Sequence, residues 1–194
     1  MGRIALRAAG GWYYRREERG RVGEAAPRYG MNDIRLKSYA TAAAVFILDR
    51  FTKRLIESNL SSMDKYRVVP GFFEIVYSKN RGIAFGLFND GTSNWSTGLV
   101  ALFSVAAVLV IAALLWNAAR IERLSLAGLS LILGGAAGNL FDRIRFGQVT
   151  DFLEFSVGNY HWPTFNVADS AIVVGCGLLL LEQVRSKRQA ANVP

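Results

Sequence analysis

Two long apolar stretches without charged residues constrain this chain more than any other feature. They run from Gly98 to Trp116 and from Leu124 to Phe141. Roughly 20 helical residues cross a bilayer core of about 30 Å, so each stretch is close to the length of a membrane-spanning helix. The 194-residue chain is 52% hydrophobic with a mean hydropathy of +0.22, which is high for a soluble domain. The sequence therefore predicts a small polytopic membrane protein.

Two further apolar stretches carry charges near one end. Trp162 to Leu181 contains Asp169 as its one charged residue before Glu182, and Ser38 to Ile56 is apolar as far as Leu48 and then contains Asp49, Arg50, Lys53 and Arg54. We interpret both as membrane helices, because their apolar residues would otherwise have nothing to pack against. The predicted fold class is an all-α membrane protein with four transmembrane helices, at about residues 38–56, 98–116, 124–142 and 166–184.

The basic residues predict how these helices are oriented. Lys and Arg concentrate in cytoplasmic connections, and here they precede the first predicted helix, separate the second from the third and follow the fourth: Arg35, Lys37, Arg120, Arg123, Arg185, Lys187 and Arg188. This pattern places both termini in the cytoplasm, with residues 189–194 as a cytoplasmic tail. Four basic residues of the first connection argue mildly against it: Lys65, Arg67, Lys79 and Arg81.

The first connection, about residues 60–92, is long enough to fold outside the membrane. Tyr66 to Ser78 mixes β-branched and aromatic residues around a Pro-Gly pair, which predicts short strands of a small extracytoplasmic β element. Asn80 to Phe88 is an amphipathic stretch broken by glycines, which indicates a segment lying at the membrane interface.

Residues 1–30 differ in character from the rest of the chain. They contain a Gly-Gly pair and clustered arginines, but no apolar run of the kind found in a secretory signal peptide. We expect this stretch to be disordered, or not translated in the cell, with Met31 as the natural first residue. The membrane domain then covers residues 31–188.

The composition also narrows the chemistry. The single histidine, His161, makes a Ser-His-Asp triad or a His-rich metal site hard to build. The net charge of +8 lies at the termini and in short gaps between apolar stretches, without basic segments interleaved with exposed aromatic residues, so nucleic acid is not an expected partner. The catalytic options are thereby reduced to carboxylates.

The unusual polar residues are predicted to meet at the outer face of the membrane. Asp49 lies at the outer end of the first predicted helix, and Asn139, Asp142 and Arg143 lie at the outer end of the third. Asp151 follows in the connection, and Asp169 opens the fourth helix. Polar groups inside a membrane are costly and usually functional. A transport pathway should spread such groups through the membrane, whereas the inner halves of all four predicted helices lack them.

Two carboxylates in this group suggest acid–base chemistry. Asn166 is placed near the N-cap of the fourth helix, so that Asp169 lies in the first turn, where the helix dipole favours an ionised carboxylate. If Asp151 reaches Asp169, the pair shares a proton, and one carboxylate can activate water while the other polarises a carbonyl. The alternatives are a simple helix cap at Asp169 and a structural ion pair between Asp142 and Arg143.

Two other functions use the same carboxylates. Asp142, Asp151 and Asp169 could bind Mg²⁺ through oxygen ligands, although their spacing does not place them on one helix. A proton or ion carrier could also use buried aspartates, but it should have polar residues in the inner half of the membrane.

Four sequence blocks, in order, resemble the signature of the lipoprotein signal peptidases, also called signal peptidase II. The blocks are Asn80 to Gly86, Gly134 to Arg143, Val149 to Phe152 and Phe165 to Ser170. The resemblance implies an aspartyl endopeptidase of the bacterial inner membrane, with its active site toward the extracytoplasmic face. Its substrates would be diacylglyceryl-modified prolipoproteins, cut just before the lipidated cysteine. It implies membrane lipids as surroundings, no cofactor or metal, and a monomer.

The same resemblance assigns roles to individual residues. It makes Asp151 and Asp169 the catalytic pair, and it gives supporting or substrate-positioning roles to Asn80, Gly82, Asn139, Asp142, Arg143, Asn166 and Asp49. Two positions depart from the family's pattern: Arg50 stands where glutamine is usual, and Ile83 where alanine is usual.

Overall fold

The computed structural model describes residues 3–8, 11–16, 31–61, 64–81, 94–117 and 121–191. The chain divides into two compact units, residues 1–30 and residues 31–194. In the first unit, strands β1 (Arg3–Ala8) and β2 (Gly11–Arg16) pair antiparallel. In β2 the aromatic run from Trp12 to Tyr14 favours extended backbone. The prediction that residues 1–30 are disordered or not translated stays a prediction. The prediction of Met31 as the natural first residue stays a prediction.

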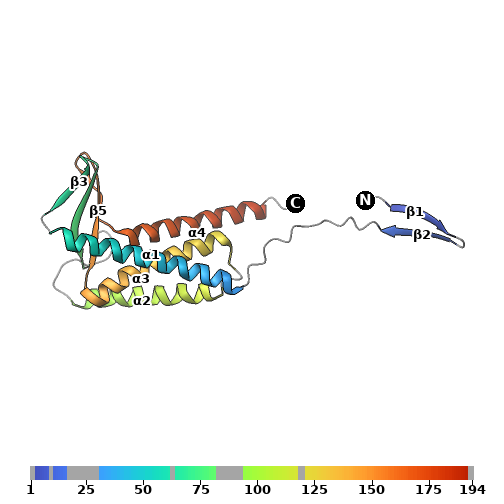
Figure 1. Ribbon diagram of the computed structural model, residues 1–194, viewed down its shortest axis with the longest axis horizontal. Coiled ribbons are helices and arrows are strands. Elements are labelled where there is room, and N and C mark those ends of the chain that lie inside the picture. Colours follow the sequence, from blue (N-terminus) through green and yellow to red (C-terminus); the bar gives the residue numbers. More distant parts are fainter. Residues whose placement is uncertain are drawn as a thin grey trace. The chain divides into compact units, whose positions relative to one another are not determined.

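The second unit contains four long helices: α1 (Met31–Asn59), α2 (Asn94–Trp116), α3 (Arg123–Phe146) and α4 (Val167–Ala191). The helices lie side by side, and α3 packs against each of the other three (Figure 1). Gly128 of α3 lies against Gly175 of α4 so closely that a Cβ on either residue would overlap the other's carbonyl oxygen. Small residues thus allow the helix backbones to approach one another, as occurs in membrane helix pairs.

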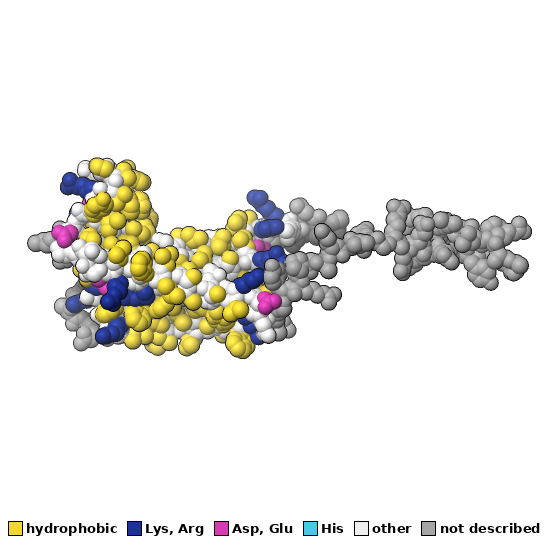
Figure 2. All heavy atoms as spheres, viewed as in Figure 1, with side chains coloured by type: hydrophobic (Ala, Val, Ile, Leu, Met, Phe, Trp, Pro, Cys, Tyr) yellow, Lys and Arg dark blue, Asp and Glu magenta, His cyan; other side chains and the backbone are white. Residues whose placement is uncertain are grey.

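Three of these helices are long and apolar enough to cross a membrane: Gly98–Trp116 within α2, Arg123–Phe146 and Val167–Gln189. Hydrophobic side chains cover the long sides of the helices, whereas many Lys and Arg side chains lie toward the two ends (Figure 2). The sequence predicted a fourth span within α1, which is a helix over the expected residues but is not among the three. The four-span topology and the orientation of the termini therefore stay predictions.

A four-stranded antiparallel sheet stands at one end of the helices, in the order β3-β4-β5-β6 (Figure 1). Its strands are β3 (Lys65–Val69), β4 (Phe73–Asn80), β5 (Val149–Val157) and β6 (Tyr160–His161). The strands predicted within Tyr66 to Ser78 are confirmed as β3 and β4. The sequence analysis treated the residues between the third and fourth helices as a connection only, and β5 and β6 correct this. The predicted interfacial segment lies outside the described residues from position 82 onward, as do residues 192–194 of the predicted tail.

Local sequence explains where the elements around the sheet begin and end. Helix α3 ends at Phe146 and is capped by Gly147, which has a left-handed backbone (φ 69°) and donates its N–H to the carbonyl of Arg143. Strand β5 starts two residues later and pairs with β4, so the chain turns at once from helix into sheet. This turn places the start of β5 within hydrogen-bond distance of Glu57, near the end of α1, and of Asn166, just before α4.

Candidate active site

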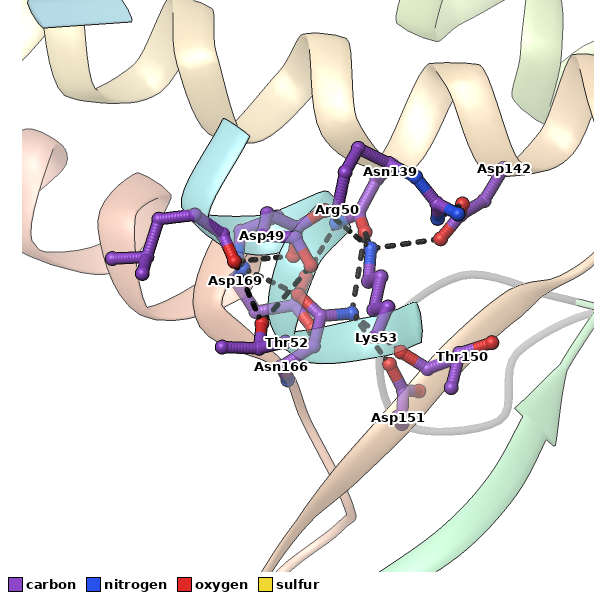
Figure 3. A network of polar contacts seen from close by, with 12 residues as sticks. Asp49, Arg50, Thr52, Lys53, Asn139, Asp142, Thr150, Asp151, Asn166 and Asp169 are labelled. Atoms are coloured by element: carbon purple, nitrogen blue, oxygen red, sulfur yellow. Dashed lines mark hydrogen bonds and ion pairs between the residues drawn. The ribbon is translucent and has the colours of Figure 1, made fainter. Parts of the chain in front are cut away.

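A cluster of polar side chains gathers where the sheet meets the helix ends, and Figure 3 shows these side chains pointing toward one another. They come from four elements: Asp49, Arg50 and Lys53 from α1; Asn139 and Asp142 from α3; Thr150 and Asp151 from β5; and Asn166 and Asp169 from the start of α4. Five residues of this set were predicted from sequence to lie at one depth of the membrane, and their gathering at one end of the helices agrees with that prediction.

Asp151 is held by two side-chain amides. Its carboxylate is nearly inaccessible, with 2% of the residue exposed. Asn166 donates from Nδ2 to Oδ1 at 2.6 Å, and Asn80 donates from Nδ2 to Oδ2 at 3.1 Å. Burial, followed by the negative charge of Asp169, raises the pKa of Asp151 to about 6. This carboxyl group therefore exchanges its proton near neutral pH, as a general acid or base must.

Asp169 is held by the helix terminus that contains it. The side chain of Asn166 accepts the Asp169 backbone N–H at 2.9 Å, which confirms Asn166 as the N-cap of α4. In return, Asp169 Oδ2 accepts the backbone N–H of Asn166 at 3.2 Å, and Asn139 donates from Nδ2 to Asp169 Oδ1 at 2.8 Å. The reciprocal pair is a capping box, so Asp169 does cap the helix, as one alternative held. Its contact with Asn139 also ties it to the rest of the cluster.

Asn166 connects the two carboxylates, because its side-chain amide donates to Asp151 and its backbone N–H donates to Asp169. Besides Asp151, its Nδ2 faces Asn139 Oδ1 at 3.2 Å and the carbonyl of Thr150 at 3.3 Å. Asn166 is fully buried, and its Oδ1 is occupied by the Asp169 N–H. The orientation of this single amide is therefore fixed, with the donor toward Asp151 and the acceptor toward Asp169. The carboxylates from a strand and from a helix are thereby brought into one hydrogen-bonded network.

A second layer of charge lies behind the carboxylates. Lys53 is completely buried, and its Nζ lies 2.8 Å from Asp49 Oδ2, Asp142 Oδ2 and Asn139 Oδ1. Because Lys53 occupies the carbonyl oxygen of Asn139, the amide nitrogen of Asn139 is turned toward Asp169. Sequence reasoning did not count Lys53 among the site residues. An acid–base pair four residues apart at the end of an apolar helix was the signal that could have identified it.

Asp49 and Asp142 have supporting positions in this layer. Asp49 Oδ1 accepts a hydrogen bond of 3.0 Å from the backbone N–H of Ala168. This N–H lies in the first turn of α4 and has no carbonyl partner within the helix. Asp142 forms ion pairs with Lys53 and Arg50 of α1, whereas the alternative drawn from the sequence names Arg143 as its partner. The guanidinium of Arg50 also lies over the ring of Phe141, 4.8 Å from its centroid. Asp49 and Asp142 thus join α1 to the other two helices of the site.

Two predicted site residues remain. The charge of Arg143 interacts with those of Asp169, Asp151 and Asp142, which places this guanidinium beside the carboxylates. Gly82 lies outside the described residues. Within the described ranges no three His, Cys, Asp or Glu side chains are grouped as metal ligands usually are. The carboxylates of the cluster are bound by amides and cations instead.

A helical, largely apolar unit with paired carboxylates at one end of its helices defines a class, the polytopic membrane enzymes with acidic active sites. The signal peptidase (SPase) II family profile matches residues 41–185. The chain therefore belongs to the signal peptidase II family, and it is a protease of that type.

Individual relatives agree with this assignment. The lipoprotein signal peptidase of Solibacter usitatus (strain Ellin6076) is 63% identical over 163 residues, which cover 84% of this chain and 99% of that protein. The lipoprotein signal peptidase of Oleidesulfovibrio alaskensis is 44% identical over 149 residues, covering 77% and 95%. A solved structure described as a bacterial membrane enzyme superposes with a TM-score of 0.72 at 25% identity, covering 81% of this chain and 93% of that one.

Proposed function

We propose that this chain is an aspartyl endopeptidase of the bacterial inner membrane, with Asp151 and Asp169 as its catalytic dyad. Its substrates are diacylglyceryl-modified prolipoproteins, and it cuts the peptide bond just before the lipidated cysteine. The observation that carries the proposal is the network through the buried residue Asn166, which donates from its side-chain amide to the Asp151 carboxylate and from its backbone N–H to the Asp169 carboxylate. A helix cap alone would not require the second carboxylate, nor Asn139 and Asn80 as further donors.

The two carboxylates have different roles in the proposed reaction. Asp151 holds the shared proton, because burial raises its pKa to about 6, while Asp169 is ionised at the start of α4. Asp169 takes a proton from water as the water oxygen bonds to the carbonyl carbon, and Asp151 gives its proton to the carbonyl oxygen. When the tetrahedral intermediate collapses, the C–N bond breaks, the amine nitrogen takes the proton from Asp169, and Asp151 regains its own. The products are the signal peptide's carboxyl terminus and a free amine on the lipidated cysteine.

The proposed topology has four membrane spans, both termini in the cytoplasm and the dyad toward the extracytoplasmic face. Helix α1 supports the fourth span, because its charged Asp49 and Lys53 are completely buried while Ile47, Phe51 and Leu55 are more than half exposed. The mean hydropathy of a sequence window does not reveal that the polar and apolar residues of α1 lie on separate faces of the helix. A lipid-modified substrate then enters sideways from the bilayer, and the proposed working unit is a monomer.

The decisive experiment is cleavage of a diacylglyceryl-modified precursor by the purified protein, beside the same precursor without lipid. We expect cleavage of the lipidated precursor only, with a new amino terminus at the modified cysteine. Asp151→Asn and Asp169→Asn should each abolish cleavage and leave a folded protein in the membrane. Normal processing by either variant would disprove the dyad. Excess chelator should have no effect, whereas a complete loss of activity would favour the Mg²⁺ alternative.

A further inference from the structure

The two proposed catalytic carboxylates belong to different supports. Asp169 belongs to α4, which is packed firmly against α3, whereas Asp151 belongs to β5 of the sheet. Their relative position therefore depends on how the sheet is attached to the helices. A displacement of about 1 Å can cost on the order of 100-fold in rate, so this attachment is important for catalysis.

Three side chains at the base of the sheet form such an attachment. Thr150 Oγ1 donates a short hydrogen bond to Glu57 Oε1 in the last turn of α1. Lys79 of β4 donates from Nζ to the same Glu57 oxygen at 3.2 Å and to Thr150 Oγ1 at 2.9 Å. Thr150 is 1% exposed, and the side chains of Glu57 and Lys79 are 22% and 29% exposed. Each of the three touches both others, so the set closes a ring across α1, β4 and β5.

The register of the sheet places this ring directly behind the dyad. Lys79 pairs with Thr150, and the next pair along is Ser78 with Asp151. Side chains alternate between the faces of a sheet, so Thr150 and Lys79 lie on one face while Asp151 and Asn80 lie on the other. The ring therefore attaches β4 and β5 to α1 on the face of the sheet opposite the Asp151 carboxylate. Thr150 immediately precedes Asp151 in β5, and Lys79 immediately precedes its hydrogen-bond donor Asn80 in β4.

We propose that Glu57, Lys79 and Thr150 are positioning residues, which hold Asp151 at the distance from Asp169 that hydrolysis requires. None of the three contacts the dyad carboxylates in the described hydrogen bonds. Their hydrogen bonds involve charged groups and a buried hydroxyl, and such bonds are both stronger and more directional than those between neutral groups. The inference rests on the proposed function for its effect on rate, but the attachment itself can be tested without it.

The test first compares three single variants of the full-length protein in detergent, and then combines one of them with Glu57→Ala. Thr150→Val removes the hydroxyl and keeps a β-branched side chain suited to a strand. Thr150→Ser keeps the hydroxyl. Glu74→Gln is the matched control, because it removes an acidic partner of Lys65 and Arg67 on the same sheet, away from the dyad.

We expect Thr150→Val to lower kcat for the lipidated precursor by about tenfold to 100-fold with little change in KM, as a displaced dyad requires. Thr150→Ser should recover most of this loss, and Glu74→Gln should match the wild-type protein. Combining Thr150→Val with Glu57→Ala should cost no more than the larger single effect, because both break the same ring. A Thr150→Val rate within about twofold of wild type, or a serine variant as slow as the valine variant, would overturn the proposal.

Hydrogen exchange provides the readout that does not depend on activity. Amides of residues 149–157 should exchange faster in Thr150→Val than in the wild-type protein, the serine variant and the control. Unchanged exchange would mean that the ring does not hold the strand, whatever the rates. Failure of the wild-type protein to cleave the lipidated precursor would instead refute the proposed function, and the exchange comparison would still decide the attachment.

Discussion

Replacing Asp151 with asparagine separates the cost of burying this carboxylate from its chemistry. Asparagine has nearly the same shape and cannot ionise, and both amide donors that hold the carboxylate remain in place. Removing the charge should therefore change how the free energy of unfolding depends on pH. The direction and size of that change follow from the raised pKa of Asp151.

The pKa of Asp151 rises from 3.8 to about 6 on folding, so the native protein retains a proton that the unfolded chain has lost. Stability therefore falls as pH rises between these values and is constant above about 7. Two pKa units correspond to about 3 kcal/mol. Asparagine at position 151 avoids the penalty of burying an ionised carboxylate. Its side-chain NH₂ group, however, faces one of the two amide donors that held the carboxylate, which costs about 1–2 kcal/mol at every pH. The variant should thus be less stable than wild type near pH 4 and more stable above pH 7.

The assay is the thermal unfolding midpoint in detergent at several pH values between 4 and 8. One kcal/mol shifts the midpoint of a protein of this size by about 2–4 °C, so the difference between Asp151→Asn and wild type should change by roughly 6–12 °C across the range. Glu122→Gln is the control, because Glu122 is exposed and makes no side-chain cap hydrogen bond. A midpoint difference that stays constant from pH 4 to pH 8 would show that the folded carboxyl has an ordinary pKa and would refute the reasoning.

Three further predictions concern the groups around the dyad. Asn80→Ala removes a hydrogen bond that lowers the pKa of Asp151, so the alkaline limb of the pH–rate profile should move up by about half a unit, and a downward shift would contradict this. Lys53→Met leaves two buried carboxylates without their shared cation and should lower stability by roughly 3–5 kcal/mol, measured by thermal unfolding. Gly138→Ala places a Cβ 2.5 Å from a carboxylate oxygen and should cost about 1–3 kcal/mol, whereas Gly98→Ala, with nothing within 4 Å, should be nearly neutral in the same assay.

The sequence predicted the parts of the site that depend on local pattern. The apolar stretches identified α2 and α3 almost to their ends. The order of proline, asparagine and aspartate identified the N-cap of α4 at Asn166, because capping depends on only four neighbouring residues. The β element within Tyr66 to Ser78 was identified for a similar reason, since a Pro-Gly turn lies between two short β-rich runs.

The parts that depend on distant partners were not predicted. Strand β5 has a nine-residue run rich in Val, Thr and Phe that favours a strand, but its pairing with β4 could not be predicted from that run. Lys53 was overlooked because its role follows from three acceptors, two of which are contributed by α3. Glu57 and Thr150 are 93 residues apart in sequence, and no spacing rule connects them.

Charge balance gives a physical reason why the proposed dyad would carry one proton. The layer behind it contains two acids and two bases, which cancel: Asp49, Asp142, Arg50 and Lys53. A dyad with one proton carries a single negative charge, and the nearby Arg143 balances it. Ionising the second carboxylate would leave one uncompensated negative charge in a poorly solvated site, which is costly. Without the charge of Arg50, the whole cluster would already be negative before the proposed dyad lost its proton.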